Sequence, residues 1–172
     1  MKRIKVMTEI AIGISMAVVC SFIKLWEMPQ GGAVSLVMIP IFVVAMRCGV
    51  FAGCMVGGVY GLLAVLLSGV IYHPASILLD YILAFSLLGI AGFFRKNLVR
   101  SIVGIFLGTL ARFISSVISG AVIFASFAPV GQNPWIYSVC YQAAYMLPEM
   151  IITIIAFIFL YTNNFLKGKR EI

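Results

Sequence analysis

Long apolar runs separated by short charged groups make up most of this sequence, and they restrict its fold more than any single motif. A helix needs roughly 20 mostly apolar residues to cross the hydrocarbon core of a bilayer. The chain has 172 residues, of which 63% are hydrophobic and 10% charged, so about six such helices fit with short loops. We therefore expect an all-α integral membrane protein, with residues 1–172 forming a single six-helix transmembrane domain.

The apolar runs also predict where each span lies. The second run is short for a full crossing, which predicts a helix that is tilted or shielded by its neighbours. The six expected spans are Ile4–Leu25, Ala33–Met46, the stretch after Arg47 up to Ser68, Ala75–Phe94, Ser101 to between Phe124 and Phe127, and Ile136–Tyr161.

The placement of basic residues predicts the orientation, because cytoplasmic loops of membrane proteins carry an excess of lysine and arginine. With the amino terminus inside, Lys24 is the only external basic residue, and Arg112 lies within a span. Both termini are then cytoplasmic, and the net charge of +7 reflects membrane orientation with no nucleic-acid partner. The ten cytoplasmic basic residues are Lys2, Arg3, Lys5, Arg47, Arg95, Lys96, Arg100, Lys167, Lys169 and Arg170.

One carboxylate, Asp80, interrupts an apolar run. An ionisable group at membrane depth costs a few kcal/mol or more, so it usually faces a cavity or a partner. Asp80 lies about six residues into a helix that enters from outside, which places it roughly 8 Å below the outer boundary. Six other residues on the fourth, fifth and sixth spans fall at similar depth, and we expect them to share an externally open pocket: Tyr81, Ser116, Gly120, Tyr137, Tyr141 and Gln142.

The chemistry of this layer predicts the class of ligand. A buried carboxylate with aromatic neighbours suits a small, positively charged heteroaromatic molecule, through ion pairing and cation–π contact. The alternative is that Asp80 pairs structurally with Arg112, although Glu149 is about as good a partner for that arginine. His73 and Trp135 complete the candidates at the outer boundary, where a structural histidine and a membrane aromatic belt are the alternatives.

Catalysis finds little support in the residues. The chain has one histidine, no clustered metal ligands, no nucleophile elbow and no phosphate-binding loop. We expect neither an enzyme nor a cofactor or metal site. A small membrane enzyme acting on lipid is the distant alternative, but it would require a polar cluster near the cytoplasmic boundary.

Small residues at four-residue intervals predict close helix packing. Gly49, Gly53, Gly57 and Gly61 follow this spacing, and we expect them to pack mainly within the chain. Ala11 and Ser15 form a second pair on the first span, where the partner could be another protein.

Four segments together resemble the ThiT/YuaJ family, the thiamine-specific substrate-binding (S) components of energy-coupling factor (ECF) transporters. The resemblance implies a multi-pass subunit of a prokaryotic cell membrane, which binds thiamine with high affinity at the outer face. It also implies that the subunit reorients with a transmembrane coupling protein and two ATPases. The segments are MPQGGAVSLVMIPIF (28–42), HPASILLDYILAF (73–85), ISGAVIFASFAP (118–129) and WIYS (135–138).

The resemblance assigns roles to individual residues. Asp80 and Tyr81 match the family's acidic-Tyr pair, whose carboxylate engages the cationic ligand. Gly120, Phe124 and Tyr137 match a glycine and two aromatic positions of the site.

Other matches concern docking and ligand choice. Ala11 and Ser15 match the small-residue face that docks on the coupling protein. Ser116 stands where the family has histidine and Gln142 where it has asparagine, so a related ligand such as a pyrimidine precursor is the alternative to thiamine. Mobility of the loop Pro29–Gly32 over the pocket is also permitted by its glycines.

Overall fold

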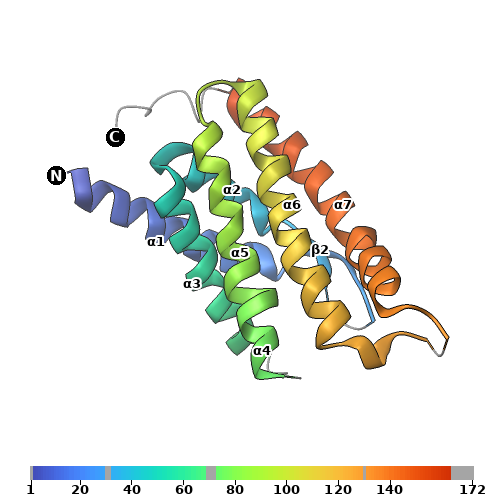
Figure 1. Ribbon diagram of the computed structural model, residues 1–172. Helices are drawn as coiled ribbons and strands as arrows, with labels where there is room; N and C mark the ends of the chain where they lie inside the picture. Colours follow the sequence, from blue (N-terminus) through green and yellow to red (C-terminus); the bar gives the residue numbers. More distant parts are fainter. Residues whose placement is uncertain (1, 30–31, 69–72, 130, 164–172) are drawn as a thin grey trace.

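The chain forms six helical stretches, as expected, in a computed structural model that describes residues 2–29, 32–68, 73–129 and 131–163 (Figure 1). The fourth stretch is continuous but changes its winding along its length. The elements are α1 (Lys2–Ser21), α2 (Met38–Cys48), α3 (Val50–Ser68), then α4 (Pro74–Ser76), π-helical η1 (Ile77–Leu83), α5 (Ala84–Leu87) and 3₁₀-helical η2 (Leu88–Phe94), followed by α6 (Leu98–Val122), the turn η3 (Ala125–Phe127) and α7 (Pro134–Thr162).

Five of these stretches are long and apolar enough to cross a membrane: Arg3–Ser21, Val50–Leu67, Pro74–Phe94, Leu98–Val122 and Pro134–Thr162. The short helix α2 is the exception, and seven of its residues are buried. It packs against α1, α3, η2 and α7. The prediction that neighbours shield the second run is therefore confirmed.

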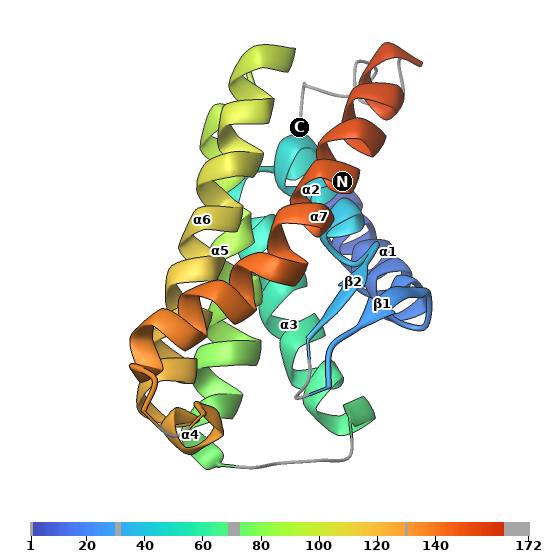
Figure 2. The same cartoon turned by 90° about the vertical axis from the view of Figure 1, so that its right-hand side faces the viewer.

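The ends of the first two predicted spans are different from our expectation. Lys24–Glu27 (β1) and Ala33–Ser35 (β2) form an antiparallel hairpin instead of continuing the helices (Figure 2). Charge explains why the first helix ends early. Lys24 and Glu27 are exposed and form an ion pair with an N–O distance of 2.6 Å. If the helix continued, it would carry these two charges into hydrocarbon.

The hairpin turn requires a glycine at its end. Gly32 has a φ of 85°, and a Cβ added there would lie 2.8 Å from Cε1 of Tyr145. The turn is therefore seated directly on α7. Residues 30 and 31 of the Pro29–Gly32 loop lie outside the described residues, so its role as a cover stays a prediction.

The core lies around α2. Phe42 and Met38 of α2 are fully buried, as are Leu88 of η2, Ile105 of α6 and Phe157 of α7. The same cluster includes Ala17 of α1 and Val56 of α3, so side chains of one short central helix share a core with all five longer stretches.

The glycine spacing on α3 acts within the chain, as predicted. A Cβ on Gly57 would lie 2.0 Å from the carbonyl oxygen of Phe85, and one on Gly61 would lie 2.5 Å from that of Tyr81. Gly53 approaches the backbone of Gly89 in the same way. These contacts press α3 against the stretch that carries Asp80.

Helix α1 lies at the side of the bundle and has two different faces. Gly13 and Ala17 turn inward, and Ala17 is fully buried. Ala11 and Ser15 are exposed, with the Ser15 hydroxyl donating to the Ala11 carbonyl. The predicted docking pair thus lies on an open face.

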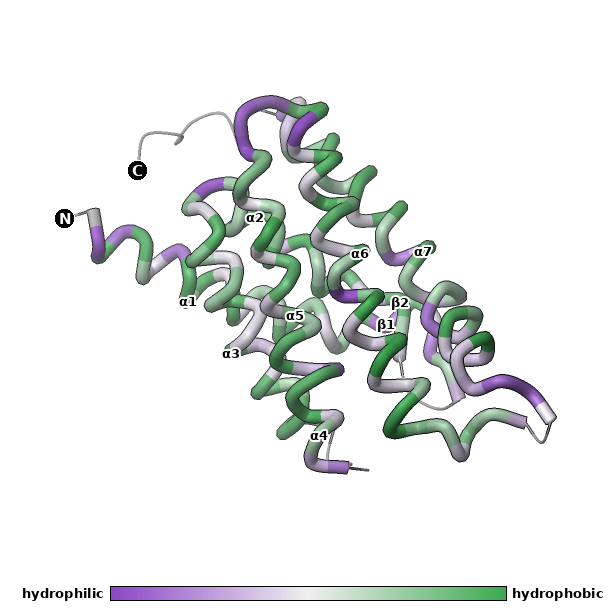
Figure 3. The backbone as a smooth tube through the Cα atoms, viewed as in Figure 1, coloured by the Kyte–Doolittle hydropathy of each residue, from purple (hydrophilic) through white to green (hydrophobic). Residues whose placement is uncertain are grey.

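Hydrophilic residues concentrate at the two ends of the bundle, and the helices between these ends are mostly hydrophobic (Figure 3). The loop from Arg95 to Asn97 lies at the end of the bundle where α1 begins and α7 ends, and α4 lies at the opposite end (Figure 1). This separation agrees with the predicted orientation for the described basic residues. Lys167, Lys169 and Arg170 lie outside the described residues.

Candidate functional site

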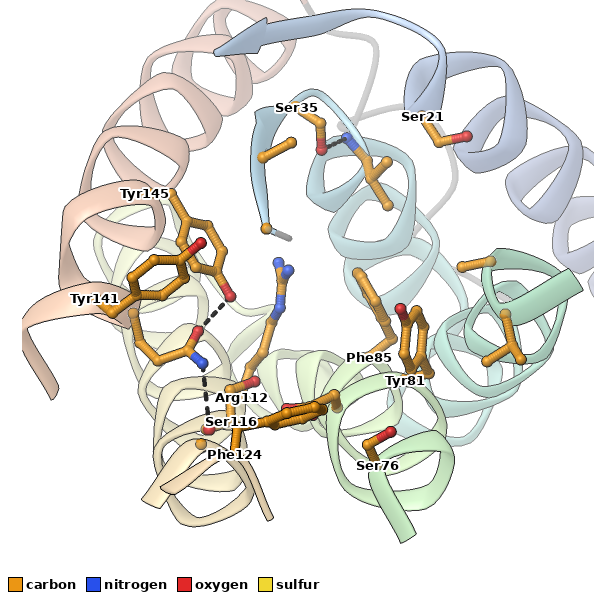
Figure 4. A pocket seen from close by; sticks show the side chains of 18 of the residues that line it. Ser21, Ser35, Ser76, Tyr81, Phe85, Arg112, Ser116, Phe124, Tyr141 and Tyr145 are labelled. Atoms are coloured by element: carbon orange, nitrogen blue, oxygen red, sulfur yellow. Dashed lines mark hydrogen bonds between the residues drawn. The ribbon is translucent and has the colours of Figure 1, made fainter. Parts of the chain in front are cut away.

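A cavity of about 420 Å³ lies between the fourth stretch, α6, α7 and β2, and the ends of α1 and α3 also reach it (Figure 4). Its size falls within the range of small-ligand pockets. Of the ten candidate ligand-binding residues, eight line this cavity: Asp80, Tyr81, Ser116, Gly120, Phe124, Tyr137, Tyr141 and Gln142.

Asp80 reaches the cavity from the π-helical stretch η1. Its Oδ2 accepts a hydrogen bond from the Ser119 hydroxyl of α6. One residue earlier, the Leu79 carbonyl accepts a hydrogen bond of 2.7 Å from the Ser115 hydroxyl. Helix α6 therefore secures η1 through two serines, which compensates for the irregular hydrogen bonding of a π-helical turn.

The structure favours Glu149 over Asp80 as the partner of Arg112. Arg112 Nη1 donates to Glu149 Oε2 at 3.0 Å, and both residues are buried. The Ser35 hydroxyl on β2 donates to the other oxygen of Glu149 at 2.8 Å. Asp80 forms no ion pair with any residue that the structure describes.

Arg112 also lines the cavity and contacts an aromatic ring there. Its guanidinium carbon lies 4.4 Å from the centroid of the Phe85 ring. Its Nε is buried without a hydrogen-bond partner. Figure 4 shows the side chain projecting into the space between Tyr145 and Phe85.

Gln142 lines the cavity, and both the nitrogen and the oxygen of its amide form hydrogen bonds. Its Nε2 donates to the Ser116 carbonyl at 3.3 Å, and its Oε1 accepts from the Tyr145 hydroxyl. Ser116 is 3% exposed and its backbone contacts Gln142. The two positions at which the resemblance implies histidine and asparagine therefore lie beside each other.

Aromatic rings line the α7 side of the cavity. Tyr137, Tyr141 and Tyr145 follow one another at four-residue spacing, with ring centroids 5.9 Å and 6.4 Å apart. Phe124 lies beside Phe127 on the segment after α6, at 5.8 Å. Rings on two sides of a cavity can stack against a flat cation.

Gly120 brings α6 and α7 close together at the cavity. A Cβ at this position would lie 2.3 Å from the Ser138 hydroxyl oxygen and 3.2 Å from its Cβ. The Ser138 hydroxyl donates to the Val117 carbonyl, which links the two helices. Gly120 therefore contributes by its lack of a side chain.

Two candidates are not brought to the cavity. His73 is exposed and caps α4, where its Nδ1 accepts from the Ala75 backbone nitrogen at 3.1 Å. Trp135 is 50% exposed in the first turn of α7. Neither side chain lines the cavity, and the capping contact is a structural role for His73.

Several residues that line or support the cavity were not predicted from the sequence. Ser119, which supports Asp80 without lining the cavity, could have been found, because it follows Ser116 by three residues and shares its helix face. Phe85 and Tyr145 follow Tyr81 and Tyr141 by four residues and could have been found in the same way. Ser35 had no such signal, because it reaches the cavity only through the hairpin.

Metal and disulfide chemistry are not indicated by the described residues. They contain no group of three or more histidine, cysteine, aspartate or glutamate side chains that could hold a metal ion. Cys20, Cys48, Cys54 and Cys140 are free thiols.

Comparisons with known proteins cover almost the entire chain. The family model described as "Thiamine transporter protein (Thia_YuaJ)" matches residues 7–167. Thiamine transporter ThiT of Bacillus subtilis (strain 168) is 40% identical over 187 aligned positions, which cover 98% of this chain and 97% of that protein. Thiamine transporter ThiT of Lacticaseibacillus paracasei (strain ATCC 334) is 28% identical, covering 90% and 85%.

A solved structure is similar as well. ThiT from Listeria monocytogenes superimposes with a TM-score of 0.85 at 30% sequence identity, covering 96% of this chain and 98% of that one. The similarity therefore extends over all the helices that surround the cavity.

Proposed function

The chain belongs to the thiamine transporter protein (Thia_YuaJ) family of multi-pass membrane proteins, and from this premise we propose that its cavity binds thiamine. The observation that carries the proposal is the half-buried carboxylate of Asp80, which has no ion-pair partner among the described residues. A positively charged thiazolium ring supplies the missing charge. The tyrosines of α7 and Phe124 offer ring faces to a flat cation.

The residues proposed to contact the ligand are those that the cavity gathers. Asp80 is the counter-ion, and Tyr81, Phe124, Tyr137 and Tyr141 surround the rings. Ser116, Gly120 and Gln142 shape the α6–α7 side, where the amide of Gln142 is already engaged by protein groups. His73 and Trp135 do not line the cavity, so we do not propose them as ligand contacts.

Calorimetric titration of detergent-purified protein tests this function. Thiamine should bind, and its neutral aminopyrimidine fragment and its cationic thiazolium fragment should each bind more weakly, because each makes part of the contacts. If thiamine gives no heat even at millimolar concentration, thiamine is not the ligand. Tighter binding of the pyrimidine fragment than of thiamine would favour the alternative of a pyrimidine precursor.

We also propose that the chain acts as the S component of an ECF transporter and catalyses no reaction itself. The exposed pair Ala11 and Ser15 on α1 supports this, because small residues allow another helix to approach closely. The partner would be a transmembrane coupling protein with two ATPases. Ala11→Leu and Ser15→Leu should abolish thiamine uptake by cells while leaving thiamine binding by the purified protein intact. If the variants lose neither uptake nor binding, this face is not the docking site.

A further inference from the structure

Glu149 is a fully buried acid on α7 that does not line the cavity. Two groups on other elements bind its carboxylate, the Ser35 hydroxyl of β2 at 2.8 Å and Arg112 Nη1 of α6 at 3.0 Å. A buried charge pair of this kind is rarely an efficient source of stability. Because its partner Arg112 lines the cavity, Glu149 is placed to act on the binding site through that arginine.

Arg112 and Asp80 carry opposite charges in the same cavity. Ser119, which donates to Asp80, follows Arg112 by seven residues, which is two turns on one helix face and about 10 Å along the axis. Arginine is a long side chain, and attraction between unit charges is strong where water is excluded. An Arg112 side chain without a partner in the wall would therefore be drawn to Asp80.

Two contacts hold Arg112 elsewhere. Its guanidinium lies 4.4 Å from the ring centroid of Phe85 and donates to Glu149. We infer that Glu149 is a positioning residue, which holds Arg112 beside Phe85 and so leaves the Asp80 carboxylate available to a cationic ligand. This inference rests on the proposed function, since it explains why that carboxylate stays open to an external charge.

A double-mutant cycle tests the inference by calorimetric titration of thiamine. Glu149→Gln should weaken thiamine binding by about 100-fold or more, because the released Arg112 then competes for Asp80. Adding Arg112→Gln should restore affinity to within about threefold of wild type, because the competing charge is gone. A purely structural role predicts the opposite, with the double variant at least as weak as the single one.

Two results would overturn the inference. One is unchanged affinity of a folded Glu149→Gln variant. The other is a folded double variant that still binds weakly, which would mean that Arg112 contacts the ligand directly, through its unpartnered Nε. Absence of binding by wild type in the same assay would count against the proposed function instead.

A milder variant keeps the test decisive if Glu149→Gln does not fold. Ser35→Ala removes one of the two groups that hold Glu149 and changes no charge. It should weaken binding by roughly fivefold in wild type and have no effect in the Arg112→Gln, Glu149→Gln background. An equal loss in both backgrounds would overturn the inference, because Ser35 would then act on the cavity directly.

Discussion

At the scale of single residues, the cavity is organised by how its charges are distributed. Asp80 is held by the neutral hydroxyl of Ser119, whereas Arg112 is held by the carboxylate of Glu149. A hydroxyl orients a carboxylate without neutralising it. The negative charge of Asp80 therefore remains the open charge of the cavity.

Ser119 carries a prediction at this scale. Ser119→Ala removes the hydrogen bond that orients Asp80 and should reduce thiamine affinity by about 1 kcal/mol, or roughly fivefold. Titration calorimetry measures the change. Ser126→Ala, at an exposed serine outside the cavity, is the matched control and should bind as wild type does. Equal affinity of Ser119→Ala and the control would show that Asp80 does not depend on this bond.

The candidate residues could largely be predicted from the sequence, because depth in the membrane follows from helix geometry. Asp80 and Ser116 lie on different helices, and estimating how far each is from the outer boundary was enough to place them in one layer. Partner choice could not be predicted in this way. Arg112 had two acids within comparable reach, and only side-chain packing selects Glu149.

At the scale of helices and strands, the fourth stretch is shaped by what contacts it. Helix α3 presents glycines to its backbone, and α6 supplies serine hydroxyls to η1. These contacts stabilise a winding that an isolated apolar helix would not adopt. The helices were predictable from apolar runs, but the π-helical winding at Asp80 was not, because it depends on neighbouring helices.

The hairpin shows a second limit of sequence interpretation. Leu25 and Val34 extend the apolar runs of the first two spans, so hydropathy alone assigns them to helices. Two local features favour strands instead: the ion pair of Lys24 and Glu27, and the turn at Gly32. These local features outweigh hydropathy where a chain leaves the membrane.

The contact between α3 and the fourth stretch gives a prediction at this scale. Gly57→Ala should destabilise the protein by about 2 kcal/mol and lower its melting temperature in detergent by about 5 °C, because the new Cβ meets the backbone of Phe85. Gly58→Ala is the neighbouring control, since its Cβ meets only the rotatable hydroxyl of Ser86. Similar melting temperatures for the two variants would contradict this packing.

At the scale of the whole molecule, the described basic loops and the cavity define two ends. The loop between η2 and α6, which contains Arg95 and Lys96, lies at the end where α1 begins and α7 ends, and α4 lies at the opposite end (Figure 1). The positive-inside rule places the first end in the cytoplasm. The segment between η3 and α7 then lies outside the cell.

Cysteine labelling tests this orientation. In a background without the four native cysteines, Gln132→Cys should react with a membrane-impermeant maleimide in intact cells, because Gln132 is exposed on the external segment. Lys96→Cys, on the opposite loop, should react only after permeabilisation. The reverse pattern would invert the orientation, and the cavity would then have to be supplied from the cytoplasm.

The central claim is that Asp80 is the counter-ion of a cationic ligand, and one measurement tests it most directly. Thiamine is titrated calorimetrically into wild type, Asp80→Asn and Asp80→Glu. Asp80→Asn keeps the size and removes the charge, so it should weaken binding by about 3 kcal/mol, or more than 100-fold. Asp80→Glu keeps the charge and should remain closer to wild type. Binding of thiamine by Asp80→Asn with wild-type affinity would contradict the account.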